Sequence, residues 1–127
     1  MKPIAVIAAS ACIASTAWAG PLSDFFQNGG RADQATQIKC NAIGNAYGMA
    51  AQYRDSRLSP QSTADGLTRM LESYPDLGHQ FAIKVTNLVY FDQRFAGVGG
   101  PALVEQMTVQ CLDPKGKFTH PRYSQAQ

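Results

Sequence analysis

Few side chains in this 127-residue sequence have the types and spacing that catalysis or metal binding requires. His79 and Asp76 are close enough in sequence to form a dyad that could act as a general base. A single histidine at the start of a predicted helix is more often a polar surface group, and His120 lies near the C-terminus. No histidines, cysteines and carboxylates are spaced as metal ligands, and the C-x-x-C-H motif of covalent haem attachment is absent. We therefore expect no catalytic residue, no metal and no cofactor, and an enzymatic role ranks behind the hypotheses below.

The first nineteen residues have the layout of an export signal. Lys2 provides a positive charge, residues 4–17 form a mostly apolar segment, and Ala17-Trp18-Ala19 places small residues where signal peptidase requires them. This layout predicts a signal peptide at 1–19, cleavage after Ala19, and a mature domain of residues 20–127. The predicted location is therefore periplasmic or secreted.

The cysteines are interpreted in the light of that location. Cleavage after Ala19 removes Cys12 and leaves Cys40 and Cys111, which an oxidising compartment would join in one disulfide. Two free thiols or a redox pair are the alternatives, but the sequence contains no C-x-x-C motif. A separate alternative is that Ala9-Ser10-Ala11-Cys12 is a lipoprotein signal and that Cys12 is lipidated. A structural disulfide between Cys40 and Cys111 is the favoured prediction.

Size and charge narrow the class of protein. Residues 20–127 are sufficient for one domain with its own core. The whole chain has 11 Lys and Arg against 9 Asp and Glu, a formal net charge of +2 at pH 7. Because the charges are scattered and nearly balanced, we expect no nucleic-acid partner. After the signal, no apolar run is long enough to span a bilayer, so we expect no transmembrane segment.

Periodic apolar positions predict an all-α fold of four helices. The predicted helices cover residues 33–54, 60–74, 79–95 and 101–112, and a polar C-terminal tail follows at 115–127. Ser59 followed by Pro60 is a strong helix start, with the serine as N-cap. Residues 81–86 also alternate as a strand would, but a long run without a turn favours a helix. Short connections favour antiparallel neighbours, which predicts a four-helix up-down bundle tied by the disulfide.

In the first predicted helix, apolar positions that recur every three or four residues define the expected core face. These positions are Ala35, Ile38, Ala42, Ala46, Met49 and Tyr53. Cys40 and Tyr47 lie on the flank of this face, and Gly44 and Gly48 lie elsewhere, where a neighbouring helix could approach closely. In an up-down bundle, Cys40 and Cys111 lie at the same end, so the predicted topology and the predicted disulfide agree.

Several aromatic and arginine side chains could contact a protein partner. The alternative for each aromatic side chain is ordinary packing in the core or at its edge. The possible partner-binding residues are Tyr47, Tyr53, Arg54, Arg57, Phe91 and Arg94.

Three short segments carry a resemblance to a known family. They are Cys40 with Asn45-Ala46-Tyr47, then Asn87-Leu88-Val89-Tyr90, then Cys111-Leu112-Asp113. This layout resembles small exported one-disulfide helical proteins of proteobacteria, including the immunity proteins that neutralise type VI secreted amidase effectors in the periplasm. The resemblance implies that Cys40 and Cys111 match that family's disulfide and that the protein inhibits a cell-wall hydrolase.

Two functional hypotheses from different classes follow. The first is a non-enzymatic periplasmic or secreted interaction protein, such as an inhibitor or immunity factor, with a protein partner in the periplasm. The alternative is a periplasmic small-ligand carrier or chaperone with an apolar groove between helices.

Overall fold

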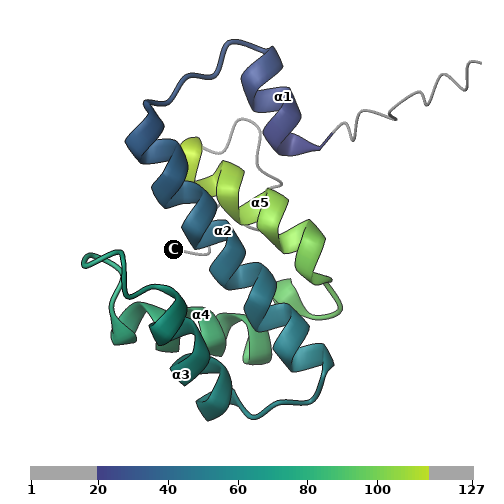
Figure 1. The fold of residues 1–127 in the computed structure, drawn as a ribbon. Coiled ribbons are helices and arrows are strands. Elements are labelled where there is room, and N and C mark those ends of the chain that lie inside the picture. Colours follow the sequence, from purple (N-terminus) through teal and green to yellow (C-terminus); the bar gives the residue numbers. More distant parts are fainter. Residues whose placement is uncertain (1–19, 115–127) are drawn as a thin grey trace, which may run out of the picture.

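The computed structural model describes residues 20–114, and this part of the chain is all-helical with no strand (Figure 1). Its elements are α1 (Pro21–Gln27), α2 (Gln34–Asp55), α3 (Pro60–Met70), α4 (His79–Phe91), the 3-10 helix η1 (Gln93–Phe95) and α5 (Gly100–Leu112). The all-α prediction is confirmed, and residues 81–86 are helical. The predicted signal peptide (1–19) and the predicted polar tail (115–127) lie outside the described residues, as do Cys12 and His120.

Local sequence signals explain most helix ends. Ser59 Oγ accepts a hydrogen bond from Ser62 N at 3.1 Å, and Pro60 occupies the first turn of α3, as predicted. α4 ends at Phe91 rather than at residue 95, because Asp92 takes an extended conformation and its carboxylate accepts a hydrogen bond from Arg94 N at 2.9 Å. The segment before α2, which none of the four predicted helices covers, contains the seven-residue helix α1.

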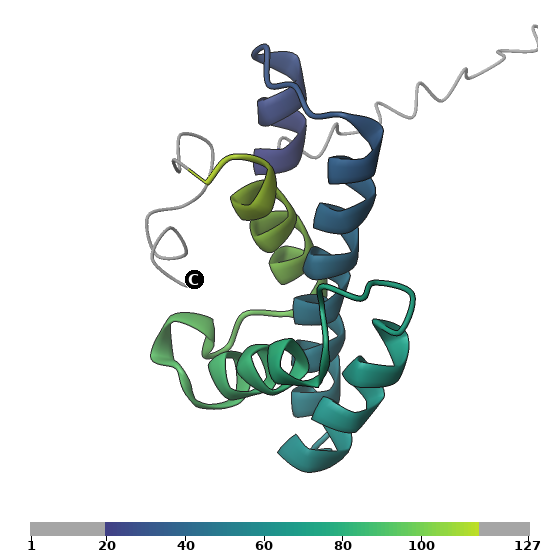
Figure 2. The ribbon, with the colours of Figure 1, turned by 90° about the vertical axis from the view of Figure 1, so that its left-hand side faces the viewer.

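α2 is the central helix, and the others pack at its two ends (Figures 1 and 2). α5 runs antiparallel beside the N-terminal half of α2, and α1 packs on α5. α3 and α4 pack against each other and against the C-terminal half of α2, where α4 crosses α2 obliquely (Figure 1). The four-helix up-down bundle is therefore not confirmed, because α5 and the α3–α4 pair occupy different halves of α2.

The contact between α2 and α5 is unusually close. A Cβ atom on Gly44 would overlap Thr108 Oγ1 and lie 2.7 Å from Val104 O, and one on Gly48 would overlap the Val104 side chain. On α5, a Cβ atom on Gly100 would lie 2.9 Å from Gly48 O. Cysteine and two glycines recur every four residues on α2, opposite residues that also recur every four on α5, so a ridge of one helix fits a groove of the other.

A disulfide closes this interface at the start of α2. Cys40 is bonded to Cys111, with Cα atoms 5.4 Å apart, as predicted. The bridge joins positions 71 residues apart, and in the chain-entropy model a loop of this length contributes about 4 kcal/mol of stability. The disulfide and the glycines thus fix α5 on the same face of α2.

The core face predicted for α2 is confirmed in part. Ala46 is buried in the core, and Ala42 and Met49 are half-buried and pack against it, whereas Ile38 is 48% exposed. The buried positions of α2 are Cys40, Gly44, Ala46, Tyr47, Gly48, Ala50 and Ala51. The hydrophobic pattern left the Cys40–Gly44–Gly48 side outside the core face, because glycines carry no apolar side chain, but the close approach of a helix at the two glycines is confirmed.

Replacing Gly44 with Ala tests this interface. We expect Gly44→Ala to destabilise the mature protein by about 1–3 kcal/mol, because the new methyl group must displace Thr108 or α5. Gly66→Ala is the matched control within α3, where a Cβ atom would meet only Tyr53 Cε2 at 3.6 Å. That control should gain about 0.5–1 kcal/mol from helix propensity. Urea unfolding measures the change in the free energy of unfolding for both variants. If Gly44→Ala were stabilised as much as Gly66→Ala, the close contact between α2 and α5 would be contradicted.

Candidate partner-binding surfaces

Arg54 joins the last turn of α2 to the connection between α4 and α5. Its Nη1 donates to Val89 O at 3.0 Å and to Phe95 O at 2.9 Å, and its Nη2 donates to Val98 O at 2.7 Å. Nε donates to Asp55 Oδ1 at 3.1 Å, and only 16% of the Arg54 side chain is exposed. Because most of its donors are engaged by the chain itself, Arg54 has a structural role and is poorly placed to contact a partner.

Tyr47, another possible partner-binding residue, lies in the core. It is buried and stacks on Phe95, with ring centroids 5.8 Å apart and an interplanar angle of 14°. Burial raises the pKa of the Tyr47 phenol to about 12, and the positive charge of Arg94 opposes that shift. The ring therefore stays neutral at physiological pH and anchors η1 to α2.

Arg57 lies in a strained turn at the exposed end of α2. Its φ of 63° makes it the one non-glycine residue with positive φ among the described residues. Leu58 N donates to Tyr53 O and Arg57 N donates to Arg54 O, both at 3.0 Å, which is the hydrogen-bond pattern of a Schellman motif. Glycine normally occupies this position, so the arginine is retained at a conformational cost.

The remaining predicted residues differ in exposure. Phe91, at the end of α4, is 69% exposed, while Tyr53 is half-buried. Arg94 is half-buried and paired with Asp92, with Nη2 to Oδ2 at 2.7 Å and Nε to Oδ1 at 3.0 Å. Hydrogen bonds from the Arg94 side chain and backbone lower the pKa of Asp92 to about 2. Of the six predicted positions, Arg57 and Phe91 are therefore the two that are freely available to a partner.

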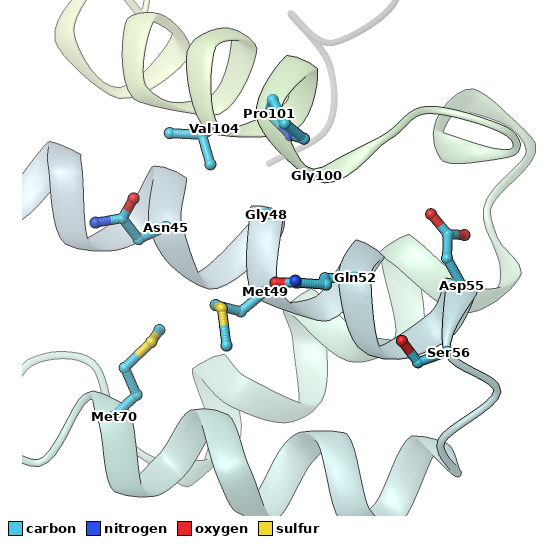
Figure 3. A pocket seen from close by; sticks show the side chains of 10 residues that line it. All are labelled: Asn45, Gly48, Met49, Gln52, Asp55, Ser56, Met70, Gly100, Pro101 and Val104. Carbon is cyan, nitrogen blue, oxygen red and sulfur yellow. The ribbon is translucent and has the colours of Figure 1, made fainter.

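A groove lies between helices, as the carrier hypothesis expects, although its lining residues were not predicted. It has a volume of about 620 Å³, and α2 forms its floor between α3 and the start of α5 (Figure 3). Met49 and Met70 approach each other across the groove from α2 and α3 (Figure 3). The lining residues are Asn45, Gly48, Met49, Gln52, Asp55, Ser56, Met70, Gly100, Pro101 and Val104.

A second hollow of about 320 Å³ extends this groove toward the start of α2. It shares Asn45 and Met70 with the first and adds Ile38, Ala42 and Tyr74. Met70 is 38% exposed. Ile38, Ala42 and Met49 belong to the stripe that we predicted to be buried, but Ile38 is exposed and Ala42 and Met49 are only half-buried, so this apolar face is partly uncovered. The apolar stripe in the sequence of α2 was therefore a signal for the groove, although we interpreted it as part of the core.

The residues that suggested chemistry do not form a catalytic pair. Thr68 Oγ1 lies 2.7 Å from Ala64 O and 2.8 Å from His79 Nδ1, so the polar contact of His79 is with a threonine and not with Asp76. Asp76 lies 3.5 Å from Lys39 Nζ, and no bond joins it to His79. Within residues 20–114, no group of three or more His, Cys, Asp and Glu could hold a metal ion.

Comparisons with known proteins leave the chain without an assigned family. No family model matches the sequence, no curated protein is significantly similar to it, and no solved structure is significantly similar to its fold. In the described part of the chain, no helix combines the length and the apolar character needed to cross a membrane.

Substitutions of Arg57 distinguish the backbone strain at this position from a role of its side chain in binding a partner. We expect Arg57→Gly to be about 1 kcal/mol more stable than Arg57→Ala, because only glycine adopts this turn without strain. Both variants remove the side chain equally, so a role in binding would weaken both to the same extent. Equal unfolding free energies for the two variants would contradict a strained Arg57.

Proposed function

We propose that this protein is a non-enzymatic interaction protein of the periplasm or cell exterior that inhibits a partner enzyme. The partner would be a cell-wall hydrolase, as the resemblance to type VI amidase immunity proteins implies. The disulfide between Cys40 and Cys111 is compatible with an exported protein. The signal layout of residues 1–19 supports the same location.

The observation that carries the proposal is the partly uncovered apolar face of α2 that lines the groove. From Ile38 to Gln52 the face extends for about 21 Å, the length of a four-turn helix. Two methionines line it, and their flexible, polarisable side chains adapt to a partner's surface. Asp55 is the one charged lining residue of the main groove, which leaves a mostly apolar surface with amide groups at Asn45 and Gln52. This composition suits the apolar face of a helix or loop from another protein.

A small-ligand carrier is the second candidate, and the same groove favours it. A volume of about 620 Å³ lies within the range of pockets that hold small apolar molecules. Such pockets usually enclose most of their ligand, whereas this groove lies along one side of α2 between two helices (Figure 3). The protein-partner hypothesis therefore ranks first.

The test is inhibition of peptidoglycan hydrolysis. We expect the mature protein to slow amide-bond cleavage of peptidoglycan by a cell-envelope extract of the producing organism. Met70→Glu should require about tenfold more protein for the same inhibition, because it places a charge in the apolar groove. Phe26→Glu is the matched control, since Phe26 is 44% exposed on α1, away from the groove.

The possible results separate the candidates. An absence of inhibition at any protein concentration would contradict the inhibitor proposal. If a fluorescent apolar dye such as anilinonaphthalene sulfonate then bound the parent protein but not Met70→Glu, the carrier hypothesis would replace it. If Met70→Glu inhibited hydrolysis as well as the parent protein does, the assignment of the partner-binding site to the groove would be contradicted. Circular dichroism of each variant confirms that it is folded.

A further inference from the structure

Glu105, in α5, places its side-chain carboxylate at the beginning of α1, although the two segments are far apart in sequence. Leu22 N donates to Glu105 Oε2 at 3.4 Å, across 83 positions of sequence. A Cβ atom on Gly20 would overlap this carboxylate and would lie 2.7 Å from Glu105 Cδ. Any side chain at position 20 would therefore have to displace the carboxylate. Because residue 20 is a glycine, its backbone can lie next to the Glu105 carboxylate.

Within residues 20–114, no salt bridge joins the carboxylate to a cationic side chain. Among the described residues the ion pairs are Lys39–Asp76, Arg54–Asp55 and Arg94–Asp92, and none includes Glu105. Glu105 is half-buried, so its charge is only partly surrounded by water. A half-buried carboxylate gains from an adjacent positive charge, because the surroundings screen the attraction less than bulk water does.

Signal cleavage would create such a charge at this position. In the precursor, the nitrogen of Gly20 belongs to a neutral peptide bond with Ala19. Hydrolysis of that bond adds water, leaves a carboxylate on Ala19, and leaves a primary amine on Gly20 that is protonated at neutral pH. The nitrogen and a Cβ atom share the same Cα and each lie about 1.5 Å from it. The new ammonium nitrogen therefore lies within about 5 Å of Glu105 Oε2, so a small movement of the flexible glutamate side chain forms the ion pair.

We propose that Glu105 is the receptor for the amino terminus that cleavage after Ala19 creates, and that this ion pair fastens α1 to α5 only in the mature protein. α1 needs such an anchor, because it has seven residues and Phe25 is its one buried side chain. Isolated helices of this length are unstable in water. The precursor lacks the ion pair and is the less stable form, which suits a chain that must remain unfolded during export.

The inference rests on the predicted cleavage site and not on the proposed function. Its test uses mature protein that begins at Gly20 and a form that begins at Ala19. The second form keeps the same net charge but moves the ammonium group by one residue. Each form is prepared with Glu105 and with Glu105→Gln, oxidised to form the disulfide, and melted at low and at high salt.

We expect the form beginning at Gly20 to melt about 2–5 °C above the form beginning at Ala19. Glu105→Gln should abolish this difference, and 1 M salt should reduce it. A difference that persists in Glu105→Gln, or no difference in the parent, would overturn the proposal. Mass spectrometry of the exported protein should give a chain that starts at Gly20, and any other start, including a lipidated Cys12, would also overturn it.

Discussion

The close approach of α5 to α2 is the contact on which the rest of this fold depends. Gly44 and Gly48 have no side chain to hold α5 away, and the Cys40–Cys111 disulfide fixes its last turn. The approach is close enough that Thr108 Oγ1 is buried without a hydrogen-bond partner among the described residues. A buried hydroxyl without a partner costs free energy, so the packing and the disulfide must offset that cost.

The position of α5 on the face of α2 that contains Gly44 and Gly48 determines which other faces of α2 are covered by the remaining helices. The second half of α2 packs against α3 and α4, and the carbonyl contacts of Arg54 hold the connection from α4 to α5 against its last turn. One apolar face between α3 and α5 is left partly uncovered, and it contains the exposed Ile38 and the half-buried Met49. The candidate partner surface therefore follows from the same contact that organises the core.

The sequence predicted local structure better than the arrangement of the helices. The Ser59 cap, the helix at 81–86 and the pairing of Cys40 with Cys111 follow from local patterns or from the small number of cysteines. The close approach of a helix at Gly44 and Gly48 was predicted, but periodicity did not place this side of α2 in the core, because it detects apolar side chains and glycines have none. A groove between helices was part of the carrier hypothesis, but its residues were not predicted, since their stripe has the spacing of a buried face. No local pattern predicted that Arg54 would bind backbone carbonyls from distant segments.

Methionine oxidation tests the orientation of α2 most directly. Met49 and Met70 line the groove, whereas Met107 lies buried in the core. Brief treatment of the mature protein with hydrogen peroxide, followed by peptide mass spectrometry, measures how fast each thioether becomes a sulfoxide. With α5 on the glycine face, Met70 and then Met49 should oxidise well before Met107. Oxidation of Met107 as fast as Met70, or equal protection of all three, would contradict an uncovered groove on α2.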